Sequence, residues 1–400
     1  MKNTFFIRFL PLVFTLIVYS CEMDRKPFSE PVGEDKPVDE RVSTDQKKDM
    51  ILLTERPANL ETPLEYFKQD YTPNEVFFVR WHLANMPQQI DPDTFRLRVG
   101  GAVKKPLELS MKDLKTRFQQ YSLPALAVCA GNARSTFDPR VPGAQWKNGA
   151  MGNARWTGVR LRDILAAAQP AEASKEVAFN GMDSPPLPEV PDFVKSLTFP
   201  HCMDGEVMVA YAMNGKDLPM LNGYPLKLVV PGWYASYWVG MLNEIKVYED
   251  SFKGYWMDKA YRIPKSSVNG NEKPDSIPSE TVPLSTIAIR SIFVWPLPEA
   301  VIPQQKATEV QGLAFDQGSG ISKVELSTDG GKNWMLAKLD PELGKYAWRR
   351  WRFMLSPDAE GAVKLLVRAT NRKGETQPVK HWNHSGYLKN EIEQITYQAK

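Results

Sequence analysis

Cys129 is the first residue whose type and setting could support chemistry. The apolar run 123–128 delivers it onto the small-residue turn Ala130-Gly131-Asn132, where the backbone can approach a ligand closely. A thiolate at such a strand-to-loop transition would face a pocket and is a soft ligand for a metal centre. On residue types alone the alternative is a small buried hydrophobe.

Two arginines and one tyrosine are the next candidates for contact with a small ligand. Arg134 follows Cys129 by five residues, and Arg80 lies near the end of a strand predicted over residues 75–82. A guanidinium suits this role because it can bind an oxyanion through two parallel hydrogen bonds. Tyr261 could contribute a phenol. The alternatives are a surface arginine for Arg80 and a core tyrosine for Tyr261.

The elements that must position these residues follow from the apolar pattern. Helical spacing predicts a helix whose buried residues are Leu161, Ile164, Leu165 and Ala168. Strands are predicted at residues 95–99, 177–183 and 223–232, and a helix followed by an Asn-Gly turn is predicted at residues 206–219. Lys227 lies inside the apolar run 223–232, so it needs a partner.

A second domain is predicted after residues 266–283, a stretch rich in Ser, Pro, Asn, Lys and Glu that indicates a linker. Short strands separated by turn signals are predicted at residues 286–294, 307–315, 321–327, 334–339, 346–353 and 363–369. Asp329-Gly330-Gly331 marks a hairpin-type turn between two of them. This spacing is typical of an antiparallel, immunoglobulin-like β-sandwich, expected over residues 284–397.

Several longer motifs can be compared with known families. The Cys129 segment contains C-A-G-N-x-R, followed by G-A-x-G-N-A-x-W-x-G-V-x-L-x-D-I-L; F-F-V-R-x-H occurs at residues 77–82 and V-E-L-S-T-D-G-G-K-N-W at residues 324–334. Together they resemble the sulfite oxidase family over most of the chain. The resemblance implies an α+β fold, with a mixed α/β molybdopterin-binding domain over residues 51–265 followed by the immunoglobulin-like dimerisation domain.

The resemblance also implies a cofactor and the residues that hold it. Molybdenum would be bound by the dithiolene of one pterin and by Cys129, while Arg80, Arg134 and Tyr261 would form the catalytic anion pocket. The cofactor-binding positions it implies are Phe78, Val79, Arg80, Trp81, His82, Cys129, Asp183, Asn222, Lys227, Trp238, Val239 and Gly240. Lys227 stands where the family has an arginine that contacts the pterin phosphate, and could serve as a point charge.

The chain departs from the family where well-known members carry positive or titratable groups. Pro142 and Ser385 stand where a cation and an arginine are expected, and Asn222 and Gly240 replace a histidine and a lysine. These losses reduce the positive field around substrate and cofactor. The identity of the substrate is therefore less constrained by the sequence than the identity of the cofactor.

The composition restricts partners and further cofactors. Fifty basic and 47 acidic residues give a net charge of +3, which does not suggest nucleic acid as a partner. Three cysteines exclude a disulfide framework, no C-x-x-C-H motif for c-type haem occurs, and the four histidines lack a convincing zinc pattern. No haem is expected, and electrons would leave to a separate acceptor, typically a c-type cytochrome.

The N-terminus suggests export. Residues 1–20 have basic residues and then an apolar run, as in a signal peptide, and V-Y-S-C ending at Cys21 resembles a bacterial lipobox. The alternative is an ordinary signal peptide with a chance cysteine. Residues 21–50 are charged and are expected to be a disordered tether. A lipoprotein on the periplasmic side of a membrane, attached only through its lipid anchor, is predicted.

The leading hypothesis for function is molybdenum-dependent oxidation of sulfite to sulfate by a homodimer. A second hypothesis keeps the cofactor but transfers oxygen to or from another substrate, such as an S-oxide or N-oxide. A third is a non-catalytic binding lipoprotein that uses the sandwich domain. The joint presence of Cys129, Arg80, Arg134 and Tyr261 argues against the third.

Overall fold

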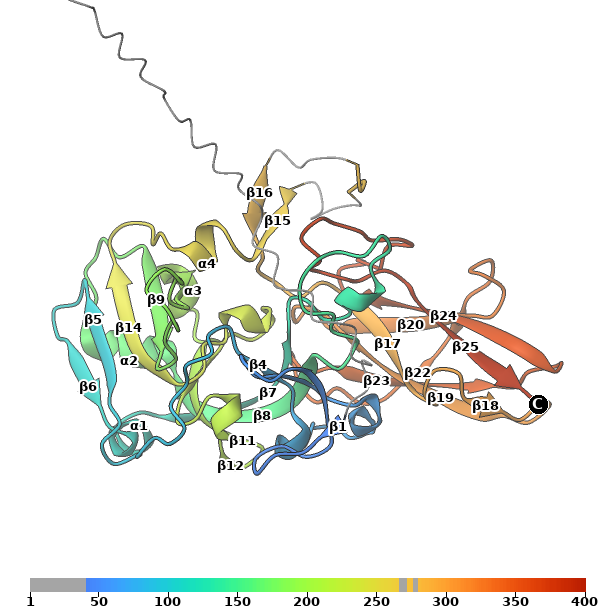
Figure 1. The fold of residues 1–400 in the computed structure, drawn as a ribbon, viewed down its shortest axis with the longest axis horizontal. Helices are drawn as coiled ribbons and strands as arrows, with labels where there is room; N and C mark the ends of the chain where they lie inside the picture. Colours follow the sequence, from blue (N-terminus) through green and yellow to red (C-terminus); the bar gives the residue numbers. More distant parts are fainter. Residues whose placement is uncertain (1–40, 266–271, 276–279) are drawn as a thin grey trace, which may run out of the picture. The chain divides into compact units, whose positions relative to one another are not determined.

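The first domain is built from three sheets and a two-stranded ribbon in the described part of the chain (Figure 1). The computed structural model describes residues 41–265, 272–275 and 280–400, which belong to one compact unit. The first sheet has the strand order β1(Arg41–Val42)-β2(Met50–Thr54)-β3(Asn59–Glu61)-β4(Val79–Arg80), and the second has the order β10(Lys195–Thr198)-β9(Glu176–Gly181)-β14(Leu242–Tyr248)-β5(Leu97–Gly101)-β6(Leu107–Leu109). The third sheet has the order β12(Lys216–Asp217)-β11(Met208–Met213)-β8(Met151–Arg160)-β7(Gln120–Val128), and β13(Lys227–Val229) also pairs with β11. The ribbon consists of β15(Arg262–Pro264) and β16(Thr281–Pro283).

Short helices and 3₁₀ turns join these strands. They are α1(Met111–Thr116), α2(Leu161–Ala168), α3(Phe199–Met203), α4(Tyr255–Asp258), η1(Leu64–Lys68), η2(Asn74–Val76), η3(Arg134–Thr136), η4(Met220–Asn222) and η5(Ala235–Tyr237). The α2 helix confirms the helix predicted from Leu161, and its four predicted core residues are all buried. On β5 the buried Leu97 and Val99 alternate with the exposed Arg98, as predicted.

The long antiparallel pair β7–β8 places Cys129. Its register runs from Gln120 opposite Val159 to Val128 opposite Met151, and the N–H of Cys129 donates to Ala150 O at 2.9 Å. The β7 strand is buried along its second half because both faces are covered, which explains its continuous apolar run. The thiol is therefore held at the end of a buried strand.

The predicted helix at residues 206–219 is wrong. These residues form the β11–β12 hairpin, and β11 lies between β8 and β13, where ladder hydrogen bonds and burial on both faces outweigh helix propensity. The Asn-Gly turn itself is confirmed, since Asn214 and Gly215 both have positive φ, 54° and 77°, as a two-residue hairpin turn requires.

Two other strand predictions were too long. In residues 75–82 the chain leaves the 3₁₀ turn η2 at Val76 and pairs with β3 only through β4, although Val76, Phe77, Phe78 and Val79 are all buried. Of the strand predicted at residues 223–232, only Lys227–Val229 form a strand, β13.

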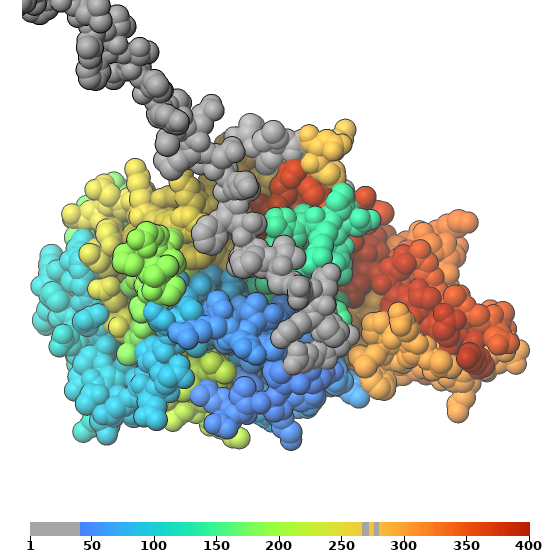
Figure 2. Space-filling model, in the orientation of Figure 1, coloured from blue at the N-terminus to red at the C-terminus, as the bar shows by residue number. Residues whose placement is uncertain are grey.

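The fold also begins earlier than residue 51. In residues 41–50, which the composition assigned to the tether, β1 pairs with β2 and Lys47 is buried. Figure 2 shows the blue stretch after residue 40 as part of the continuous surface of the fold. Most of the predicted linker and the whole predicted signal peptide, including Cys21, lie outside the described residues.

The second domain is a two-sheet β-sandwich. Its strand orders are β17(Arg290–Trp295)-β19(Thr308–Phe315)-β23(Arg349–Leu355)-β22(Lys338–Leu339) and β18(Val301–Ile302)-β25(Glu393–Ala399)-β24(Gly361–Asn371)-β20(Ile321–Ser327)-β21(Met335–Leu336). Trp351, Leu365 and Tyr397 are among the side chains buried between the sheets. Five of the six predicted strands are present, most with shifted ends, and β18 and β25 are additional. The strand predicted at residues 334–339 is instead two short strands, β21 and β22, that pair in different sheets.

The second domain contacts the loop that follows Cys129. Arg290 of β17 donates to the Asn132 amide oxygen and ion-pairs with Glu393, while Trp382 Nε1 donates to Pro139 O at 2.7 Å. In Figure 2 the green-teal loop near residue 140 accordingly lies against the red C-terminal residues. In the described part of the chain, no helix is long and apolar enough to cross a membrane.

Candidate active site

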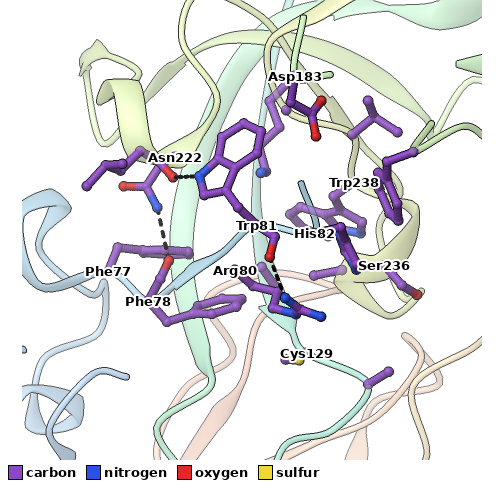
Figure 3. Close-up of a pocket in the computed structure, with 18 of the residues that line it drawn as sticks. Phe77, Phe78, Arg80, Trp81, His82, Cys129, Asp183, Asn222, Ser236 and Trp238 are labelled. Carbon is purple, nitrogen blue, oxygen red and sulfur yellow. Dashed lines mark hydrogen bonds between the residues drawn. The ribbon is translucent and has the colours of Figure 1, made fainter. Parts of the chain in front are cut away.

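A cavity in the first domain collects most of the predicted site residues (Figure 3). The space it encloses, counted out to its open mouth, is about 750 Å³. The lining residues are Phe77, Phe78, Arg80, Trp81, His82, Ala127, Cys129, Ala130, Trp156, Asp183, Phe193, Leu221, Asn222, Lys227, Ala235, Ser236, Trp238, Val239, Gly240 and Tyr261.

Cys129 lies below Arg80 in Figure 3, on the opposite side of the cavity from Asp183. Burial raises the pKa of the thiol, while the charges of Arg80 and Arg134 and the Gly131 N–H act in the opposite direction. A thiol with nearby guanidinium groups and a backbone donor is suited to become a thiolate once a metal replaces its proton. Arg80 itself donates to Asn59 Oδ1 at 3.1 Å and to the carbonyl of Trp81, so its guanidinium is held in place.

Tyr261 and His82 form a hydrogen-bonded pair at the cavity wall. The imidazole stacks on Phe193 with ring centroids 3.7 Å apart, and burial holds the pKa of His82 well below its usual value, helped by Arg80 and Lys195. Burial likewise raises the pKa of Tyr261. Both groups are therefore neutral near pH 7, and Tyr261 keeps its proton.

Arg134 is the predicted anion-pocket residue that does not line the cavity. Its Nε donates to Gly386 O at 3.1 Å and its Nη1 to Ala144 O at 3.2 Å, and it is only 8% exposed. The guanidinium is tightly enclosed, because a Cβ at Gly131 would lie 2.9 Å from its Cζ. Its charge still acts on Cys129 and Tyr261, so the structure places it close behind the cavity wall.

The far end of the cavity carries polar groups suited to a cofactor. Burial raises the pKa of Asp183 to about 7 and lowers that of Lys227 to about 8. Trp238, Val239 and Gly240 line this region together with Asn222, as predicted. Val79 is buried in β4 and is the one predicted cofactor residue missing from the lining.

The donor set fits the implied molybdopterin. Among the described residues the Ser236 hydroxyl is buried without a hydrogen-bond partner, and the Lys227 ammonium, which opens on the cavity, donates to no described group. A soft thiol at one end and an unpaired ammonium at the other match a ligand with metal-bound sulfurs and a phosphate. At Gly240 a Cβ would lie 3.2 Å from the Trp81 ring, so the bare backbone leaves room at this wall.

Sequence reasoning missed several residues of the site. Phe77, Leu221, Ala235 and Ser236 adjoin predicted positions, so the matched motifs could have included them. Phe193, Trp156 and Ala127 carry no local signal beyond their apolar character. Tyr387, from the second domain, lies with its ring 5.0 Å from Arg134 Cζ, and only the tertiary fold brings it there.

Comparisons with known proteins agree with this geometry. The family model for the oxidoreductase molybdopterin-binding domain matches residues 82–256, and that for the Mo-co oxidoreductase dimerisation domain matches residues 282–399. Mitochondrial sulfite oxidase of Homo sapiens is 34% identical over 355 residues, which cover 84% of this chain. The chain belongs to the sulfite oxidase family of molybdopterin oxidoreductases.

Two further proteins are similar to most of this chain. The nitrate reductase of Hordeum vulgare is 30% identical over 372 residues, covering 85% of this chain. The crystal structure of the sulfane dehydrogenase SoxCD from Paracoccus pantotrophus aligns with a TM-score of 0.75 and 25% identity, covering 94% of this chain and 92% of that one. The chain spans 63% of the length of the human enzyme and 41% of the length of the barley enzyme.

Proposed function

We propose that the protein oxidises sulfite to sulfate with a molybdenum cofactor bound in this cavity. The observation that carries the proposal is the joint placement of Cys129, Arg80 and the Tyr261–His82 pair on one cavity wall in a member of this family. When bound, the cofactor supplies the two-electron oxidation and the oxygen-atom transfer.

The protein's own residues would bind and orient the anion. Arg80 lies beside Cys129 and offers charge-assisted hydrogen bonds to a sulfite oxygen. With the His82 proton on Nε2, the imidazole donates to the Tyr261 oxygen and leaves the phenol proton as one more donor to the anion, and Arg134 adds positive field from behind the wall. Phe193 and Trp256 pack around the His82 ring, so they limit water at this wall.

Electrons would pass to a separate acceptor, which we propose to be a c-type cytochrome. We further propose a homodimer formed through residues 282–399, because these match the family's dimerisation domain. Light scattering should then report twice the chain mass at micromolar concentration, and a monomer would argue against it. Lipidation at Cys21 and a periplasmic location are proposed from the sequence alone, and mass spectrometry of the mature N-terminus tests the first.

Steady-state sulfite oxidation with cytochrome c as acceptor tests the main proposal. One observation favours a second candidate, oxygen transfer with a less charged substrate such as an S-oxide. Among the described lining residues only Arg80 and Lys227 are cationic, and Lys227 lies at the cofactor end. A protein that contains molybdenum, reduces an S-oxide and ignores sulfite would support this second function.

A further inference from the structure

Lys47 occupies an unexpected place for a residue from a predicted tether. It is 1% exposed, and its Nζ donates to Asn74 O at 2.7 Å, to Phe77 O at 2.9 Å and to the side-chain oxygen of Asn222. Asn222 Nδ2 donates in turn to Phe78 O at 3.0 Å. Lys47 thereby ties two residues of the cavity wall, Phe77 and Asn222, to the η2 turn beside them.

The charge of Lys47 is not balanced locally. Neither Lys47 nor Lys227 has a carboxylate within ion-pair distance among the described residues, although the more distant Glu75 acts on Lys47. Burial and the nearby charge of Lys227 lower the pKa of Lys47 to about 7. A buried ammonium beside a second, half-buried one is costly when neither has a paired anion, unless a ligand supplies negative charge.

The end of the cavity near Lys227 and Lys47 is also where two residues expected from the family, a histidine and a lysine, are absent. Asn222 and Gly240 stand where a histidine and a lysine are expected, and the structure brings both positions to Lys227 and Lys47. A Cβ at Gly240 would lie 3.7 Å from Lys227 Nζ, while Asn222 accepts directly from Lys47. Lys47, which comes from another segment, therefore lies close to the positions at which the expected histidine and lysine are absent.

We propose that Lys47 is a positioning residue for the phosphate-bearing end of the pterin cofactor, supplying positive charge that Asn222 and Gly240 no longer provide. Its three N–H groups are already used by protein acceptors, so it acts through its field and by orienting Asn222. The inference rests on the cofactor part of the proposed function and is independent of the substrate.

The test compares Lys47→Met with a matched control, Arg350→Met. Arg350 is also a buried cation, 4% exposed, and donates to Phe67 O and Gln69 O at 2.9 Å each, but it does not line the cavity. Molybdenum and pterin per folded chain, the rate of pterin loss from the holoenzyme after dilution, and the Tm of holo and cofactor-free protein are measured for each.

Lys47→Met should lose pterin about tenfold faster than wild type and should lose most of the Tm difference between holo and cofactor-free protein. Arg350→Met should lower both Tm values together and keep that difference. Turnover is divided by bound molybdenum for each variant, which separates loss of cofactor from loss of catalysis. A Lys47→Met protein that retains pterin like Arg350→Met, with an intact Tm difference, would overturn the proposal.

A second variant keeps the test decisive if Lys47→Met does not fold. Asn222→Asp gives Lys47 a carboxylate partner at almost constant volume but removes the donor to Phe78 O, so the Tm of the cofactor-free variant is measured to record that structural cost separately. We expect pterin loss to become about tenfold faster, because the added charge cancels the positive field. Wild-type retention in Asn222→Asp would refute a charge-based role. Absence of sulfite activity in wild type would leave all of these retention measurements valid.

Discussion

Tyr387 of the second domain stacks on Tyr261 of the first, with ring centroids 5.4 Å apart and planes 21° from parallel. The same ring lies 5.0 Å from Arg134 Cζ, in a cation–π contact. The second domain therefore contributes a side chain that supports both the proposed active-site tyrosine and the arginine behind it. Domain contact and site geometry are coupled through this one residue.

Replacing Tyr387 should weaken catalysis without removing the cofactor. An aromatic stack contributes about 0.5–1.5 kcal/mol, so Tyr387→Leu should lower kcat/KM by about 2- to 13-fold at constant molybdenum content. Tyr71→Leu is the control, because Tyr71 makes a comparable contact with Arg155, 5.6 Å from the ring, and does not line the cavity. If both variants have the same kcat/KM, Tyr387 does not support the active site.

The two arginines should differ in what their loss affects. Arg80→Gln removes charge-assisted hydrogen bonds to the anion, about 1.5–3 kcal/mol, and should lower kcat/KM by roughly 10- to 200-fold; because Arg80 is only partly buried, the loss of its bonds to Asn59 Oδ1 and Trp81 O should lower Tm less than the loss of Arg134 does. Arg134→Gln should also lower Tm, because Gly386 O and Ala144 O lose a buried donor. Thermal unfolding alongside steady-state kinetics separates the two, and an unchanged Tm for Arg134→Gln would contradict this assignment.

Tyr261→Phe should lower kcat more than it disturbs the fold. Only a hydroxyl is lost, and its partner His82 remains stacked on Phe193. We expect about a tenfold decrease in kcat, the effect of one lost hydrogen bond in the transition state, with Tm within a few degrees of wild type. A wild-type kcat at saturating sulfite would exclude the hydroxyl from the reaction.

The sequence was most informative where a residue's environment is local. The β7 strand, the α2 helix and the Asn214-Gly215 turn follow from apolar periodicity and turn chemistry, and the predicted site residues include 12 of the 20 residues that line the cavity. Lys47 could not be predicted, because a charged segment rich in Lys and Asp gives no sign that one lysine will be buried. Its position is decided by acceptors 27 to 175 residues away.

The β11 strand shows a different kind of failure. Its sequence suits a helix locally, but pairing with β8 and β13 satisfies its backbone in the middle of a sheet. Arg134 is a third case, since its enclosure depends on Gly386, more than two hundred residues later. In each case the deciding contact is long-range, and residue type and local spacing contain no information about it.

Cys129→Ser should abolish turnover while the domain still folds. Serine is nearly isosteric, and the backbone bond from residue 129 to Ala150 O is unaffected. A hard hydroxyl is a poorer ligand than a thiolate for a centre that already has sulfur ligands. Molybdenum analysis, circular dichroism and sulfite turnover should show a folded, inactive protein, whereas full activity would show that Cys129 is not a metal ligand.

Asp183 should make the stability of the cofactor-free protein depend on pH in a defined window. Burial raises its pKa from 3.8 to about 7, so between these values the folded state binds a proton that the unfolded state has released. The stability contributed by this neutral carboxyl is present at low pH and is lost as pH rises towards 7, by at most about 1.4 kcal/mol per pH unit.

Asp183→Asn cannot ionise, so the wild-type stability relative to this variant should fall from pH 4 to 7 and level off above it. Urea unfolding of both proteins at several pH values measures this difference, which also cancels the opposite titration of Lys47, Lys195 and Lys227. A difference that stays constant across the window would show that Asp183 is ionised in the folded protein throughout.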